Sequence, residues 1–297
     1  MTAAIRSKSL ISLAKGLAAN VGGRLLAATS PLNALDFLVP KTGYALTRGL
    51  TFGPEPRQAL DLYRPAEGAG PFPAAVFLYG GSWRWGSRGQ YRFVGEAMAR
   101  RGIVTAVADY RLHPEVRFPA FVEDGAAAVA WVKRHVAEHG GDPEAVFVLG
   151  HSAGAHTGAL LALDPRYLGM LGFDLSDLAG FIGIAGPYAV NLAEYDSVRT
   201  VFEDWPDAAD TIPLAFARGD GPPMLLMHGL KDTLVDPLNS IRLAEALRAK
   251  GASVAVELVP GVGHYRIVAA VAKPFERLAP VADRIARFIH GTGEPLA

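Results

Sequence analysis

The sequence has 297 residues, half of them hydrophobic, and its 29 basic residues balance 29 acidic ones. A chain of this length can bury one large core. A formal net charge of zero provides no field that would attract nucleic acid or a polyanionic substrate, so a small-molecule partner fits better. Cysteine is absent, which excludes disulfides, thiolate catalysis and cysteine-ligated metal centres. We expect a cytoplasmic protein, although a chain without disulfides can function in any compartment, and the oligomeric state stays open.

Residues 1–45 are predicted to form a helical cap or accessory segment. The apolar stretch Leu10 to Ala28 follows two basic residues, as the core of a secretory signal would, but Lys15 and Arg24 interrupt it. We therefore expect an amphipathic helix that packs on the domain. Weak contact with a membrane surface is one alternative, and a cleaved signal is another.

From about residue 46, short apolar runs alternate with helical patterns, which is typical of a mostly parallel sheet with helices on both faces. Several of the runs are apolar without alternation, as expected of strands covered on both sides. The predicted strands are Ala74–Tyr79, Ile103–Ala108, Ala145–Leu149, Phe181–Ala185, Met224–Met227 and Val254–Val259. The predicted helices are Tyr91–Arg101, Pro119–His139, Ala153–Leu163, Asn239–Lys250 and Pro280–His290, with Gly140 and Gly251 at C-cap positions.

These elements predict an α/β protein with one catalytic domain over residues 46–297. The stretch 191–223 mixes aspartate, proline and aromatic residues without clear periodicity. A long irregular insertion in a compact domain is usually functional or flexible. We therefore expect residues 191–223 to be a lid, forming with the N-terminal segment a cap over the catalytic face.

The strongest functional signal is the sequence Gly-His-Ser-Ala-Gly at 150–154, which follows a predicted strand and opens a helix of small residues. In this context a G-x-S-x-G motif presents a nucleophilic serine on a sharp strand-to-helix turn. The helix N-terminus also favours the negative charge that develops beside it. The motif predicts Ser152 as the nucleophile. We expect His151 to be structural, because neighbours on a tight turn point in different directions and its ring should aim away from Ser152. We expect His156 to be structural as well, packed or hydrogen-bonded on the helix that follows.

The glycine-rich loop after the strand Ala74–Tyr79 lies where a hydrolase of this type carries its oxyanion hole. Glycines there permit backbone angles that aim N–H groups inward. We assign the donors to the backbone of Gly81, Ser82 and Ala153. Trp83 and Trp85 are expected to line the substrate pocket, with a plug in the core as the alternative for a tryptophan at this place.

The acid and the base of such a hydrolase follow the serine in the order acid, then histidine. Asp232 lies just after the strand Met224–Met227, and His264 lies just after the strand Val254–Val259. Asp236 is the rival acid, but its position suits capping of the next helix. In the predicted mechanism His264 takes the proton of Ser152 and later donates it to the leaving group, while Asp232 orients the imidazole.

A metal-dependent hydrolase is the competing enzyme class. His135 and His139 are four residues apart on one predicted helix, a spacing that lets two imidazoles share zinc. Val136 stands where a zinc protease carries its general-base glutamate, and the pair closes the helix before Gly140, where cations are favoured. We therefore predict no metal site.

Five motifs taken together are specific: LDLYRP at 60–65, GGSW at 80–83, DYR at 109–111, GGDP at 140–143 and GHSAGAH at 150–156. The pattern resembles bacterial carboxylesterases of the α/β-hydrolase superfamily that are similar to prenylcysteine methylesterases and kynurenine formamidases. The resemblance runs from about Leu60 to His264 and implies the α/β-hydrolase fold and a serine hydrolase without a cofactor. Ser152, Asp232 and His264 fall on the family's triad positions. Many relatives carry histidine, which supports the glycine-rich loop, where this chain has Tyr79.

The predicted function is hydrolysis of carboxylic esters with small or medium acyl groups, through an acyl-enzyme on Ser152. Arylformamide hydrolysis is the alternative, since the same machinery can attack an amide. Peptide cleavage and acyl transfer remain further possibilities. A binding protein without activity would be expected to lack one member of the triad, and here all three positions are filled.

Overall fold

The computed structural model describes residues 39–40 and 42–291, so the predicted helix Leu10–Ala28 lies outside the described residues. Eight strands form one sheet in the order β1-β2-β4-β3-β5-β6-β7-β8. They are β1 (Tyr44–Thr51), β2 (Ala59–Pro65), β3 (Phe72–Leu78), β4 (Val104–Ala108), β5 (Gly141–His151), β6 (Gly180–Ile184), β7 (Met224–Gly229) and β8 (Val254–Val259). The six predicted strands correspond to β3 through β8.

The sheet is parallel except at one edge. β1 pairs with β2 and β2 with β4 in antiparallel fashion, whereas the pairs from β4 through β8 are parallel. The central strands are buried along most of their length, because helices cover both faces, while β1 at the edge is half-buried or exposed. This arrangement confirms the predicted mostly parallel sheet.

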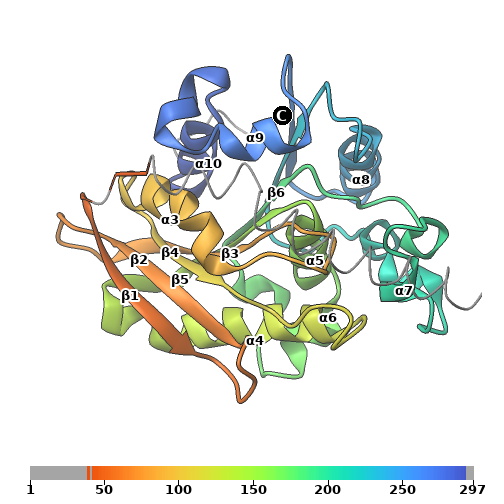
Figure 1. The fold of residues 1–297 in the computed structure, drawn as a ribbon, viewed down its shortest axis with the longest axis horizontal. Helices are drawn as coiled ribbons and strands as arrows, with labels where there is room; N and C mark the ends of the chain where they lie inside the picture. The colour runs from red at the N-terminus through yellow and green to blue at the C-terminus, as the bar shows by residue number, and fades with distance from the viewer. Residues whose placement is uncertain (1–38, 41, 292–297) are drawn as a thin grey trace, which may run out of the picture.

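Helices lie on both faces of the sheet, as predicted (Figure 1). α3 and α10 contact each other on one face, and α4 and α5 contact each other on the opposite face. The helices are α3 (Arg92–Ala99), α4 (Ala120–His135), α5 (Ala153–Leu163), α6 (Pro165–Gly169), α7 (Arg199–Phe202), α8 (Leu238–Ala249), α9 (His264–Ala269) and α10 (Val281–Ile289). None of these described helices is long and apolar enough to cross a membrane.

Glycines end two of the predicted helices. The predicted helix Pro119–His139 is divided into α4 and a 3-10 turn, Val136–His139, which stops at Gly140 with φ of 77°. Gly251 follows Lys250, the C-cap residue of α8, and has φ of 84°. Both values lie in the left-handed region that glycine adopts without strain, which confirms the two predicted helix ends.

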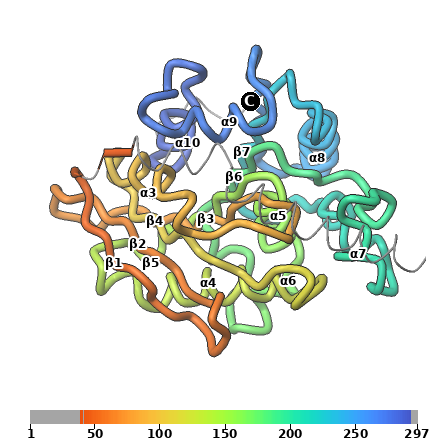
Figure 2. Tube along the Cα trace, viewed as in Figure 1, coloured from red at the N-terminus to blue at the C-terminus, as the bar shows by residue number. Residues whose placement is uncertain are grey.

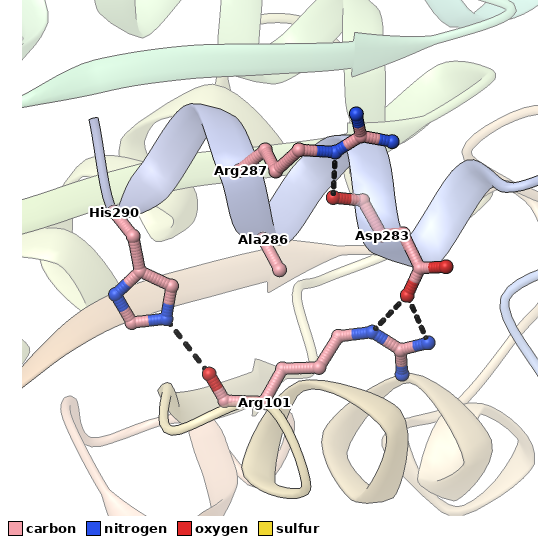
Figure 3. Close-up of a pocket in the computed structure, with 5 residues that line it drawn as sticks. All are labelled: Arg101, Asp283, Ala286, Arg287 and His290. Carbon is pink, nitrogen blue, oxygen red and sulfur yellow. Dashed lines mark hydrogen bonds and ion pairs between the residues drawn. The ribbon is translucent and has the colours of Figure 1, made fainter. Parts of the chain in front are cut away.

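Polar contacts join α10 to Arg101, just after the end of α3. His290 donates from Nε2 to the carbonyl oxygen of Arg101 over 2.7 Å, and the Arg101 guanidinium bonds Asp283 (Figure 3). These residues line a surface pocket with Ala286 and Arg287. No predicted site residue lies among the residues that line this pocket.

The irregular segment 191–223 packs beside α4 and α5, on the side of the molecule opposite β1 (Figures 1 and 2). Phe202 contacts the rings of Trp83, Phe118 and Phe121. The carbonyl oxygen of Thr211 accepts a hydrogen bond from His156 on α5 over 2.8 Å. The segment is therefore attached to the helix that follows Ser152, and its function as a lid stays a prediction.

Gly154 sets how closely α5 approaches β3. A Cβ at this position would lie 2.0 Å from the Leu78 carbonyl oxygen and 2.6 Å from that of Tyr79. Gly154→Ala should therefore destabilise the fold by about 1–3 kcal/mol, since both contacts are with backbone. Thermal unfolding should show a Tm lower by roughly 2–12 °C. Gly169→Ala, on α6 with no atom within 4 Å of the new Cβ, is the control and should leave Tm unchanged or slightly higher.

Candidate active site

Ser152 lies on a tight turn between β5 and α5. Its φ and ψ are 54° and −118°, a conformation that a non-glycine residue adopts only when its surroundings hold it there. Its N–H donates to the carbonyl oxygen of Ile184 on the neighbouring strand over 2.8 Å. A Cβ on Gly150 would lie 2.4 Å from the Gly154 carbonyl oxygen, so the turn needs glycine at this position. The serine side chain is thereby presented at the end of a central strand.

Hydrogen bonds join three of the predicted site residues into a chain. Nε2 of His264 lies 2.8 Å from Oγ of Ser152, and Nδ1 of His264 lies 2.7 Å from Oδ2 of Asp232. His264 and Asp232 are 6% and 7% exposed, so bulk water scarcely competes for these bonds. The three residues come from the ends of β5, β7 and β8, which all point to the same edge of the sheet.

Two glycines allow the loops that carry Asp232 and His264 to touch. A Cβ on Gly263 would lie 2.7 Å from the Lys231 carbonyl oxygen, and one on Gly229 would lie 2.5 Å from that of Val262. The N–H of Lys231 donates to the Val262 carbonyl oxygen over 2.9 Å. The glycine before His264 therefore permits contact between two backbones.

Asp232 accepts hydrogen bonds on both carboxylate oxygens. The N–H groups of Leu234 and Val235 each donate to Oδ1 over 2.9 Å. Oδ2 faces His264 and also Nε2 of His228, 3.3 Å away. Burial alone would raise the pKa of Asp232, but the bonds from His228 and His264 hold this pKa well below its usual range. The carboxylate therefore stays ionised beside the imidazole.

His228, which none of the sequence motifs singles out as catalytic, also contacts the site. Its Nε2 also faces the Val235 carbonyl oxygen at 3.0 Å, so Nε2 carries the proton and Nδ1 can accept from Oγ of Ser240 at 2.8 Å. Both side chains are fully buried. The sequence offered one indication of this contact, a histidine four residues before Asp232. It offered none for the contact with Ser240, which depends on how α8 packs.

Asp236, the rival acid, has the capping function that its position predicts. Its Oδ1 accepts from the N–H of Leu238 over 2.9 Å, in the first turn of α8. The side chain is exposed, and Asp236 bonds Leu238 and Asn239 of α8. The structure therefore brings Asp232, and not Asp236, to the histidine.

His151 and His156 are structural, as predicted. Nε2 of His151 donates to the His264 carbonyl oxygen over 3.2 Å, which supports the backbone of that histidine, and His156 donates to Thr211. Both rings are fully buried. Burial is the main cause that lowers the pKa of His151 to about 3 and the pKa of His156 to about 4.

These two neutral histidines predict loss of stability in acid. The unfolded chain binds protons at both residues below about pH 6.5, whereas the folded chain does not until about pH 3–4, so stability falls as pH falls through this window. At pH 4.5 each of these two histidines should lower the free energy of unfolding by about 2–3 kcal/mol. Urea unfolding from pH 8 to 4.5 measures this loss. His156→Asn should flatten the dependence, and His135→Asn, at the half-exposed end of α4, should not.

The glycine-rich loop lies beside the serine because β3 is the sheet neighbour of β5. A Cβ on Gly80 would lie 2.9 Å from Cβ of Ser152. Gly81 and Ser82 adopt φ of 140° and 53°. Among the described residues, no backbone carbonyl accepts from the N–H of either. Ala153 opens α5, so its N–H has no partner within the helix. The three predicted donors thus have N–H groups available near Ser152.

The two predicted pocket residues have different environments. Trp83 is 2% exposed, its indole Nε1 lies 3.3 Å from Oγ1 of Thr157, and its ring packs against Phe121, His156 and Phe202. The structure thus corrects the prediction of a pocket position for Trp83, because the indole fills the core below the loop. Trp85 is 41% exposed, so contact with a substrate stays a prediction for Trp85.

No group of three or more metal-ligating side chains occurs within residues 39–40 and 42–291. His135 contacts Glu138 over 3.1 Å, and the rings of His135 and His139 both lie against Trp131. The pair is therefore engaged with neighbours on its own helix and the turn that follows.

Comparison with protein families identifies the chain. Residues 122–291, more than half of the sequence, match the family described as the prolyl oligopeptidase family. The chain belongs to that family. Residues 60–169 also match the family named BD-FAE, so the two matches overlap across Ser152.

Curated relatives of this prolyl oligopeptidase family member include esterases. The chain is 28% identical over 239 residues to the probable isoprenylcysteine alpha-carbonyl methylesterase ICMEL1 of Arabidopsis thaliana, covering 73% of this chain and 50% of the relative. It is 32% identical over 242 residues to esterase LipC of Mycobacterium tuberculosis, covering 74% and 60%. The chain thus spans about half the length of the curated relatives it matches. The predicted resemblance to prenylcysteine methylesterases is confirmed.

Solved structures confirm the fold. Esterase B from Lactobacillus rhamnosis superposes with a TM-score of 0.76 at 18% identity, covering 97% of this chain and 96% of that one. Apo esterase 2 from Thermogutta terrifontis superposes with a TM-score of 0.69 at 24% identity, covering 86% and 97%. Both are esterases of the α/β-hydrolase fold, which is the fold predicted for this chain.

Proposed function

We propose that this protein is a serine carboxylesterase that hydrolyses carboxylic esters through an acyl-enzyme on Ser152. The observation that carries the proposal is the chain of hydrogen bonds from Ser152 through His264 to Asp232, at 2.8 and 2.7 Å. The esterase names among the curated relatives favour ester hydrolysis over other reactions of the same machinery.

Each residue of this chain of bonds has one function in the proposed mechanism. Nε2 of His264 takes the proton from Oγ of Ser152 as that oxygen attacks the ester carbonyl. His264 then gives the proton to the departing alcohol, and the acyl group stays on Ser152. Water repeats the sequence, with His264 as base, and releases the acid. Asp232 holds the tautomer with Nδ1 protonated and stabilises the imidazolium.

The N–H groups of Gly81, Ser82 and Ala153 are the proposed donors to the oxyanion. Such donors act by being aimed in advance at the charge that appears in the transition state, so no reorganisation is needed. The positive end of α5 adds to this effect, because Ala153 is its first residue. No cofactor enters any step.

Small or medium neutral esters are the proposed substrates. Three exposed apolar side chains are close in sequence to site residues: Trp85, Leu234 and Tyr265, with exposed fractions of 41%, 61% and 59%. A charge-balanced chain with exposed apolar groups on the loops that carry its site residues favours neutral substrates over charged ones.

Turnover of p-nitrophenyl acetate, butyrate and octanoate by the purified protein tests the proposal, with N-formylkynurenine as a parallel substrate. We expect robust ester turnover, greatest on acetate or butyrate, and weak turnover of the formamide. Activity on the formamide alone would replace ester hydrolysis with arylformamide hydrolysis. Inactivity on all four compounds would contradict a catalytic function.

A further inference from the structure

Tyr79, at the start of the glycine-rich loop, has a specific set of contacts in the structure. Tyr79 follows β3 directly and is fully buried, with its ring stacked between those of Tyr91 and Tyr110 at 5.4 and 4.7 Å. Its hydroxyl donates to Oδ1 of Asp109 over 2.8 Å and accepts from Nη2 of Arg57 over 2.7 Å. A histidine ring is shorter than a phenol, so Asp109 and Arg57 are at a distance suited to tyrosine.

Arg57 connects Tyr79 to the far end of the glycine-rich loop. The same Nη2 donates to the carbonyl oxygen of Gly86 over 2.8 Å, and Nε donates to that of Tyr110 over 2.8 Å. A Cβ on Gly86 would lie 2.6 Å from the ring of Tyr79, so the loop closes directly on this ring. One guanidinium therefore holds both ends of loop 80–86 and the end of β4.

The remaining contacts fix the backbone at the two ends of the loop. Oη of Tyr110 donates to the carbonyl oxygen of Tyr79 over 2.7 Å at the start. At the other end, Oδ1 of Asp109 accepts from the N–H of Arg88 over 2.7 Å, and the Arg88 guanidinium pairs with the same carboxylate. Asp109 and Tyr79 are both buried, so these bonds are protected from competition by water.

The loop itself needs such support. Ser82 and Trp83 have φ of 53° and 56°, in the left-handed region that costs a non-glycine residue free energy. Such a conformation persists only where the surrounding structure holds it in place. Burial, together with the Asp109 carboxylate, raises the pKa of Tyr79 well above 10, so the hydroxyl remains a donor at every pH of interest.

We infer that Tyr79, with Arg57 and Asp109, is a positioning residue for the oxyanion hole, holding loop 80–86 so that the N–H groups of Gly81 and Ser82 face the reacting carbonyl. This inference rests on the proposed esterase function. The Tyr79 hydroxyl would thus strengthen binding of the transition state although it does not contact the substrate. A displacement of about 1 Å at such donors can cost about 10²-fold in rate.

Tyr79→Phe tests the inference, because it removes the hydroxyl and keeps the stacked ring. We expect kcat for p-nitrophenyl butyrate to fall by about tenfold or more, with KM changed less than about twofold. The affinity for an alkyl trifluoromethyl ketone, which forms an oxyanion on Ser152, should fall by the same factor as kcat/KM. Tyr167→Phe, which removes a buried hydroxyl on α6, should leave all three quantities within about twofold.

Arg57→Lys provides an independent variant if Tyr79→Phe lowers folding yield. Lysine keeps the charge but cannot reach Tyr79, Gly86 and Tyr110 together, so it should reproduce the same pattern of kcat, KM and ketone affinity. The double variant should lose less than the product of the two single losses, because both changes break one network.

Three outcomes would overturn the inference while wild-type ester turnover remains intact. They are unchanged kcat and ketone affinity in Tyr79→Phe, an effect on KM alone, and losses that multiply fully in the double variant. Absence of turnover in the wild type would instead reject the proposed function, so the two failures are distinguishable.

Discussion

Ser152→Ala should lower kcat for p-nitrophenyl butyrate by about 10⁵- to 10⁶-fold, because the variant has no oxygen that can form the acyl-enzyme. The residual rate would come from the oxyanion donors and from substrate binding, which remain. KM should change little, since the missing hydroxyl contributes to bond formation more than to binding. Steady-state kinetics at several enzyme concentrations, with circular dichroism to establish the fold, measures the effect.

A second serine and a covalent label make this experiment specific. Ser176→Ala, at an exposed position in a 3-10 turn, should keep activity within about twofold. A fluorophosphonate should add one phosphonyl group to the wild type, on the peptide that contains Ser152, and none to Ser152→Ala. Loss of less than tenfold, or labelling of the alanine variant, would show that another residue is the nucleophile.

The strand-to-helix turn at Ser152 and the order of the site residues along the chain could be predicted, because they depend on local sequence. A strand, a G-x-S-x-G turn and a small-residue helix are adjacent in the chain, and the requirement for Gly150 follows from its closeness to the backbone of Gly154, four residues later. Asp232 and His264 were predictable for a related reason: parallel strands end at one edge of the sheet, so residues just after β7 and β8 must lie near each other.

The parts that sequence did not predict depend on packing between distant segments. The strand β1 is half-exposed and was not predicted, because its apolar pattern is weak and its place at the sheet edge is set by pairing with β2. The contact between His228 and Ser240 joins two elements whose approach no local pattern encodes. The bonds from Arg57 to the ends of loop 80–86 are of the same kind.

The different environments of Trp83 and Trp85, two nearby residues of one type, could be learned only from the structure. Both follow the same strand within a glycine-rich loop, and sequence treats them alike. The positive φ of Trp83 turns its side chain into the core against Phe202, from a segment about 120 residues later, whereas Trp85 remains 41% exposed. The direction of each indole depends on loop conformation, which is held by contacts outside the loop.

Asp232→Asn should lower kcat by about 10⁴-fold with little change in KM. Oδ1 of Asp232 accepts from two backbone N–H groups, which the amide oxygen of asparagine would retain. The amide nitrogen would then face Nδ1 of His264 and donate to it. That contact stabilises the tautomer with the proton on Nε2, which cannot accept the proton of Ser152. Kinetics on p-nitrophenyl butyrate, beside the thermal stability of each protein, measures the loss.

The pH dependence and the neighbouring carboxylate separate this explanation from general damage to the loop. The histidine of Asp232→Asn is in the inactive tautomer, so raising the pH should restore activity only through hydroxide-dependent attack. The rate of this variant should therefore keep rising at pH values where the wild-type rate has reached its plateau. Asp236→Asn, four residues away, still offers an oxygen to the N–H of Leu238 and should stay within about twofold of the wild type. If Asp236→Asn lost activity and Asp232→Asn kept it, Asp236 would be the acid, and the hydrogen bond between Asp232 and His264 would have no catalytic function.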